Sequence, residues 1–268
     1  MIIERSFVSL PSGRAHLDAC GAGQPVLLLH QTPRSWDEYR DVLPLLGRHY
    51  RAIAMDSMGF GDSDALPGTI SIERLAAAAH ELLLALDHRR AVVVGHHTGA
   101  AIAAEIAAAH PETVAALVLS ASPYVDDERR SKAHGKHIID EVTSREDGGH
   151  LAELWGMRRA FYPRDRPDLL ERFVVDALKA GPLAAEGHRM VDRYMMDRRL
   201  PLVRCPTLVI APTADPHAYP HAAKVVAAIR GAKLVEMENG MVPLPDQMPR
   251  EFAAAVHDFL SSLPVNAV

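Results

Sequence analysis

The chain has 268 residues, with 48% hydrophobic and 24% charged side chains, which is ordinary usage for a globular protein and excludes a disordered or fibrous one. The formal charge of -5 offers no basic surface for nucleic acid or an anionic membrane, so small molecules are the expected partners. The N-terminal stretch is interrupted too soon by Glu4 and Arg5 for a signal peptide, and no apolar run reaches the roughly 18 residues of a membrane span. Cys20 and Cys205 lie far apart, which fits a reducing compartment. We expect a cytoplasmic protein with one catalytic-size domain, and a homodimer is one option for its assembly.

Short apolar runs alternate with longer helical patterns along the chain. After a moderately alternating stretch at 14–20, the predicted strands cover 25–30, 51–55, 91–97, 115–122, 205–212 and 232–238. The predicted helices cover 35–46, 71–86, 99–110 and 249–260, with Ser35 and Ser71 as N-caps of the first two. Such alternation predicts an α/β protein with a mostly parallel central sheet and helices on both faces.

The alternation stops over residues 124–200, where helix-like segments follow one another without a strand. We interpret this stretch as an inserted helical cap on a core domain made of residues 1–123 and 201–268. Most of the large apolar side chains of the cap are expected to form its own core. A few should reach the ligand, because a cap closes the pocket beneath it.

A glycine-bounded motif carries a family resemblance. Gly95-His96-His97-Thr98-Gly99 ends a predicted strand and begins an alanine-rich helix, as does the sharp turn called a nucleophile elbow. Three further segments support the resemblance, namely LLLHQTPRSW (27–36), DSMGFGDSD (56–64) and APTADP (211–216). Over nearly its whole length the chain resembles the α/β-hydrolase superfamily, which implies the α/β-hydrolase fold and an enzyme that needs no organic cofactor.

The resemblance also implies an altered catalytic triad. His97 stands where the family has its serine, Asp215 takes the position of the acid, and Met241 occupies the position of the catalytic histidine. A thioether cannot act as acid or base, so ordinary acyl-serine chemistry is not available. We hypothesise that the ring of His97 meets Asp215 directly and that this dyad acts as a general base. The backbone N–H groups of Thr32 and Thr98 would form the oxyanion hole.

The predicted substrate-binding residues are Gln31, Trp36, Trp155 and Met241. The apolar Met241 favours a small, largely apolar substrate. The predicted reaction is hydrolysis of an ester, lactone or similar bond by base-activated water.

Two other functions stay open at this stage. The same base and oxyanion hole could serve a cofactor-free lyase, isomerase or cyclase. The altered triad is also consistent with a ligand-binding protein without activity, since a fold can outlive its function. If His97→Ala abolishes turnover while ligand still binds, the interpretation as a binding protein fails. If oxygen-18 from solvent appears in the product, the interpretation as a lyase fails.

Other polar residues near these motifs have weaker claims. Asp126 and Asp127 follow a predicted strand at a place where some members of the family carry the acid, and they are second choices behind Asp215. His217 and His221 could join the dyad as zinc ligands, but Pro220 interrupts the spacing that is diagnostic on a helix. No metal is therefore predicted.

Overall fold

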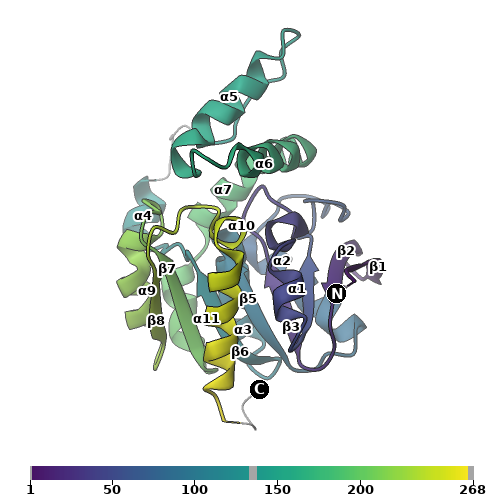
Figure 1. The fold of residues 1–268 in the computed structure, drawn as a ribbon, viewed down its shortest axis with the longest axis vertical. Coiled ribbons are helices and arrows are strands. Elements are labelled where there is room, and N and C mark those ends of the chain that lie inside the picture. The colour runs from purple at the N-terminus through teal and green to yellow at the C-terminus, as the bar shows by residue number, and fades with distance from the viewer. Residues whose placement is uncertain (1, 133–137, 265–268) are drawn as a thin grey trace.

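The computed structural model describes residues 2–132 and 138–264, within which eight strands form one sheet in the order β1-β2-β4-β3-β5-β6-β7-β8 (Figure 1). The strands are β1 (Glu4–Leu10), β2 (Gly13–Cys20), β3 (Pro25–Leu29), β4 (Arg51–Met55), β5 (Ala91–His96), β6 (Val114–Ser120), β7 (Thr207–Pro212) and β8 (Lys233–Met237). β1 and β2 are antiparallel to their neighbours, and every pair from β4–β3 to β7–β8 is parallel. The predicted α/β architecture with a mostly parallel sheet is confirmed.

Helices cover both faces of this sheet. The α-helices are α1 (Leu43–Leu46), α2 (Ile72–Ala85), α3 (Thr98–Ala109), α4 (Asp127–Lys132), α5 (Gly149–Arg158), α6 (Pro167–Ala180), α7 (Leu183–Arg193), α8 (Met196–Arg199), α9 (Ala222–Ala228), α10 (Leu244–Gln247) and α11 (Pro249–Ser261). The 3-10 helices are η1 (Trp36–Tyr39), η2 (Arg159–Phe161), η3 (Leu200–Leu202) and η4 (Tyr219–His221). α1 and α11 pack on one face, and α2, α3 and α9 pack on the other (Figure 1). In the described part of the chain no helix has both the length and the apolar character to cross a bilayer.

The central strands explain why the sequence shows continuous apolar runs. In β3, Val26 and Leu28 join the apolar cluster under α1 and α11, whereas Leu27 and Leu29 join the cluster on the opposite face. Successive side chains of a strand point to opposite faces, so a strand that is covered on both sides has to be apolar throughout.

The helix predicted over 35–46 is wrong at its centre. The structure has η1 and then α1, with residues 40–42 between them. Pro44 lacks an N–H group, so one bond of a continuous helix could not form there. The Ser71 cap is confirmed, because its hydroxyl accepts a hydrogen bond from the N–H of Arg74 at 3.3 Å.

The helices α4 to α8 lie between β6 and β7, and we call them the inserted helices. Figure 1 shows α5, α6 and α7 above one end of the sheet, at the side of the molecule opposite the C-terminus. No strand occurs among their described residues. Because they follow the carboxyl end of β6, they stand over the edge where parallel strands of such sheets present ligand sites.

A buried ion-pair cluster joins the inserted helices to the sheet domain. Arg34, in the loop after β3, is 0% exposed. Its Nε donates to Asp176 of α6 at 2.7 Å, and its Nη2 donates to Asp37 at 3.0 Å. Its Nη1 donates to Asp246 of α10. Arg172 of α6 completes the cluster through Asp37 and Asp246.

Candidate active site

His97 occupies a strained turn between β5 and α3. Its φ of 48° and ψ of -112° lie outside the regions that most side chains adopt, at a cost on the order of 1–3 kcal/mol. The turn is tight because its flanking glycines have no side chain. A Cβ on Gly95 would lie 2.1 Å from the carbonyl oxygen of Gly99, and one on Gly99 would lie 1.9 Å from that of Leu29. The chain therefore holds His97 at the end of a strand in a conformation that local preference does not favour.

The side chain of His97 reaches Asp215, in the loop after β7. The two atoms in contact are Nε2 of His97 and Oδ2 of Asp215, which lie 2.8 Å apart. Among the described residues neither atom has a hydrogen bond of ordinary geometry. Catalytic contacts often become aligned only when substrate is bound.

The carboxylate of Asp215 is held from its other side by backbone. Its Oδ1 accepts hydrogen bonds from the N–H groups of His217 at 2.8 Å and Ala218 at 3.1 Å. Burial favours the neutral acid, but the charge and contact of His97 and these two N–H groups outweigh it and lower the pKa of Asp215 to about 2. Asp215 is thus an anion throughout the neutral pH range.

A cavity of about 400 Å³ opens beside His97, a volume that suits a small molecule. It is lined by Gln31, Thr32, His97, Thr98, Pro123, Arg129, Ile138, Ile139, Arg158, His188, Val191, Asp192, His217 and Val242. The structure thereby brings four of the predicted site residues together, Gln31, Thr32, His97 and Thr98, with Asp215 directly behind His97.

Glu38 fixes the Gln31 side of the cavity. The backbone N–H and the side-chain amide of Gln31 donate to the two carboxyl oxygens of Glu38, at 2.8 and 2.5 Å. Full burial of Glu38 outweighs the charge of Arg34 and raises the pKa of Glu38 to about 8. One N–H of the Gln31 amide is therefore engaged within the protein.

Three predicted substrate-binding residues do not line the cavity, and for these the sequence interpretation is corrected. Trp36 packs against the apolar cluster under α1 and α11, while its backbone N–H donates to Asp56 at 2.6 Å. Trp155 packs against the separate core of α5 and α6. In the loop after β8 it is Val242 that lines the cavity, whereas the N–H of Met241 donates to Gln247 at 2.7 Å.

His96 holds the loop that places Val242, and not Met241, at the cavity. The histidine is 0% exposed, and burial lowers its pKa well below the ordinary value, so its ring is neutral. Its Nε2 donates to the carbonyl oxygen of Val242 at 2.8 Å, and its Nδ1 accepts from the hydroxyl of Ser120 at 3.0 Å. With both nitrogens engaged, His96 supports the turn from beneath and anchors the loop that carries Val242.

Sequence reasoning did not find the charged part of the cavity wall. Arg129, Arg158 and His188 come from the inserted helices, and His217 was considered only as a zinc ligand. One signal was present, because Arg158 lies four residues after Leu154 and thus on the apolar side of α5, and both are buried. The prediction of a largely apolar substrate depended on Met241, and the lining is instead partly apolar and partly cationic.

The zinc arrangement that we weighed around His97 does not form. Groups of three close metal-binding side chains occur twice within residues 2–132 and 138–264, and neither group includes His97, Asp215, His217 or His221.

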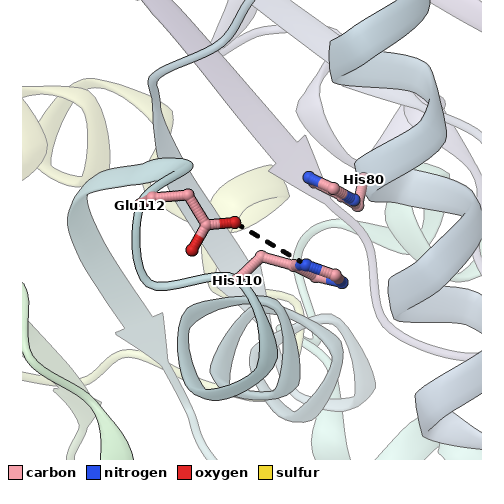
Figure 2. Close-up of side chains that lie close together, drawn as sticks. All are labelled: His80, His110 and Glu112. Atoms are coloured by element: carbon pink, nitrogen blue, oxygen red, sulfur yellow. Dashed lines mark ion pairs between the residues drawn. The ribbon is translucent and has the colours of Figure 1, made fainter.

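Figure 2 shows one of the two groups, which is formed by His80, His110 and Glu112 outside the cavity. The two imidazole rings stack with their centroids 3.8 Å apart and their planes within 10°, and Glu112 lies 3.9 Å from His110. The nitrogen lone pairs of two stacked rings lie in parallel planes, so they do not converge on one ion at the 2.0–2.1 Å typical of zinc. We assign no metal to this group.

The other group is His16, Asp56 and Asp62. His16 contacts Asp56 at 2.7 Å, and Asp62 is paired with Arg5 and Lys179. These partners account for the charges of the group.

Comparison with known proteins gives partial sequence matches. The chain is 37% identical over 106 residues to 2-hydroxy-6-oxo-6-(2'-aminophenyl)hexa-2,4-dienoic acid hydrolase of Metapseudomonas resinovorans. The matched residues make up 38% of this chain and 37% of that protein. It is 36% identical over 90 residues to the soluble epoxide hydrolase of Corynebacterium sp. (strain C12), covering 34% and 32%. The chain thus spans about a third of the length of these curated relatives.

Solved structures and a family model match far more of the chain. The enol-lactonase from Burkholderia xenovorans LB400 superimposes with a TM-score of 0.80 at 20% identity, covering 96% of this chain and 100% of that one, which is a likeness of fold. The family model described as the alpha/beta hydrolase fold matches residues 24–238, well over half of the chain. By this match the chain belongs to the alpha/beta hydrolase fold family.

Proposed function

We propose that this protein is a hydrolase in which His97, paired with Asp215, acts as a general base on water and cleaves an ester, lactone or similar bond of a small molecule. The observation that carries the proposal is the 2.8 Å contact between His97 Nε2 and Asp215 Oδ2 at a strained turn that faces a cavity. The hydrolase relatives support the reaction class.

The contact between His97 and Asp215 defines which ring nitrogen of His97 acts as the base. Because Nε2 of His97 faces a carboxylate, it is the nitrogen that carries the proton in the neutral ring, and Nδ1 is free to accept a proton from water. Asp215 holds this tautomer and stabilises the imidazolium that forms. His97 takes the place of the family's serine in this proposal, and it acts as a base and not as an acylated nucleophile.

Two backbone groups are suited to stabilise the oxyanion. Thr98 is the first residue of α3, so its N–H has no partner within the helix and lies at the positive end of the helix dipole. Thr32 lines the cavity from the loop after β3. Donors that are already in place before the reaction stabilise developing charge without reorganisation.

The inserted helices act as the cap in this proposal, with residues 124–200 over a core of residues 1–123 and 201–268. Gly187 of α7 supports this role, because a Cβ at this position would lie 2.0 Å from Cγ2 of Thr32. The backbone of α7 therefore packs directly onto the proposed oxyanion loop. Closure of this kind excludes water from the developing charge. The cytoplasmic location and a homodimer stay predictions of the sequence.

The test is the variant His97→Ala, with His110→Asn as a control histidine outside the cavity. Loss of a positioned general base lowers kcat/KM by about 10²–10⁴-fold, measured on a panel of activated esters and lactones. The control should keep the wild-type rate, and hydrolysis in oxygen-18 water should place one solvent oxygen in the product. Full activity of a folded His97→Ala variant, or product without solvent oxygen, contradicts the proposal.

A further inference from the structure

Arg158 is a buried cation in the wall of the cavity. It is 4% exposed and lies at the last residue of α5. Its Nε donates to Oδ1 of Asp140 at 2.8 Å, its Nη2 donates to Oδ2 of the same carboxylate, and its guanidinium carbon lies 4.8 Å from the ring centroid of Phe173. A fork held on one edge by a carboxylate and on one face by an aromatic ring has a fixed orientation.

One nitrogen of this guanidinium is left over. Nη1 of Arg158 has no hydrogen-bond acceptor among the described residues. Asp140 lies on the far edge of the fork and does not line the cavity, and His188 contacts the same carboxylate at 2.8 Å. The two protons of Nη1 are thus donors of a permanently charged group, in a wall that shields them from bulk water.

The neighbouring groups reinforce this polarity. Arg129 uses its Nε for Asp192 at 2.9 Å, and within the described residues its terminal nitrogens make no hydrogen bond. Asp192 is the one acidic residue in the described lining, and this pairing engages it. Burial lowers the pKa values of His188 and His217, so these rings add neutral polar groups and no further charge.

Beyond the proposed catalytic groups Thr32, His97 and Thr98 and the neighbouring Gln31, the rest of the lining is apolar. It consists of Pro123, Ile138, Ile139, Val191 and Val242. The guanidinium of Arg158, with a free nitrogen beside apolar side chains and neutral imidazoles, matches a ligand with a negative charge and an apolar body, while the second guanidinium, that of Arg129, is paired with Asp192. A carboxylate fits this description better than a dianionic phosphate, which would bring a second charge near Asp192.

We propose that Arg158, oriented by Asp140, binds a carboxylate of the substrate and makes the enzyme selective for carboxylate-bearing esters or lactones over neutral ones. The selectivity for a substrate rests on the proposed hydrolysis. The binding of a carboxylate in the cavity does not depend on it. Arg158 is a specificity-determining residue in this proposal and takes no part in the proton transfer at His97.

The kinetic test compares the mono-4-nitrophenyl ester of glutaric acid with its methyl ester, in which a methyl group caps the free carboxylate and removes its charge. Hydrogen bonds to charged groups correspond to about 10–100-fold in binding, so Arg158→Gln should raise KM for the charged ester by about this factor. KM for the neutral ester should change less than about twofold. Arg159→Gln is the matched control, because Arg159 is the next residue and is exposed. Equal effects of Arg158→Gln on both esters would overturn the proposal.

A second variant guards against misfolding, since Arg158→Gln leaves Asp140 charged and buried. The double variant Asp140→Asn with Arg158→Gln removes both charges and should show the same loss of selectivity with native circular dichroism. If this folded double variant still prefers the charged ester, Arg158 does not bind the carboxylate.

A binding measurement separates this proposal from the proposed reaction. Benzoate should bind the wild-type chain and the His97→Ala variant alike in calorimetric titration, at least tenfold more tightly than benzamide. The double variant should lose this preference. Preferential benzoate binding in a chain that hydrolyses nothing would contradict the proposed function only, whereas equal binding of benzoate and benzamide would contradict the carboxylate site only.

Discussion

Two buried arginines, Arg34 and Arg158, lie where the inserted helices meet the rest of the molecule, and they differ in how completely they are paired. Arg34 places each of its three nitrogens on a carboxylate, those of Asp37, Asp176 and Asp246. Arg158 uses two nitrogens on one carboxylate and leaves the third at a cavity. Arg34, with every nitrogen paired, holds the inserted helices to the sheet domain. Arg158, with one nitrogen unpaired among the described residues, can donate hydrogen bonds to a ligand in the cavity.

The largest expected effect concerns the saturated cluster. Arg34→Met leaves buried carboxylates with fewer partners and should lower the free energy of unfolding by about 3–5 kcal/mol, measured by urea denaturation. The double variant Asp140→Asn with Arg158→Gln removes both members of its pair and should lower it by less than about 2 kcal/mol. Similar losses of unfolding free energy in the two variants would contradict the difference in role between the two arginines.

A smaller effect is expected where α7 meets the loop after β3. Gly187→Ala should lower the free energy of unfolding by about 1–3 kcal/mol through the collision with Thr32. Gly156→Ala is the matched control, because Gly156 is also helical and a Cβ there would meet nothing within 4 Å. The control should be stabilised by roughly 0.5–1 kcal/mol through helix propensity. If both variants were stabilised alike, the helix would not be pressed against Thr32.

The smallest effect concerns the pH dependence of the dyad. The pKa of Asp215 is about 2 in the folded chain against 3.8 ordinarily, so its ionisation stabilises the fold above the unfolded pKa and this stability is lost as pH falls through the folded pKa. The contribution is about 2 kcal/mol at neutral pH, and about half of it is lost by pH 3. Wild type and Asp215→Asn should therefore differ less at pH 3 than at pH 7 in urea unfolding. A difference that does not change with pH would show that Asp215 gains nothing from its partners when it is ionised.

Much of the fold could be predicted from the sequence, because its signals are local. The apolar run of β3 and the alternation of strands with alanine-rich helices reflect burial on both faces of a sheet. The turn around His97 is local too, since Gly95 and Gly99 mark its close approaches. Pro44 marked the break between η1 and α1 in the same way, although the sequence interpretation ran a single helix through it.

The sequence by itself determined the central strands of the sheet, the turn that carries His97 and the position of Asp215 in the loop after β7. Only the tertiary structure decided that Val242 and not Met241 lines the cavity, that Trp36 and Trp155 belong to apolar cores, and that Arg158 with Asp140 forms part of the wall. The physical reason is that strand and turn signals depend on neighbours in the chain. Which face of a loop or an inserted helix meets the cavity depends instead on packing between segments far apart in sequence.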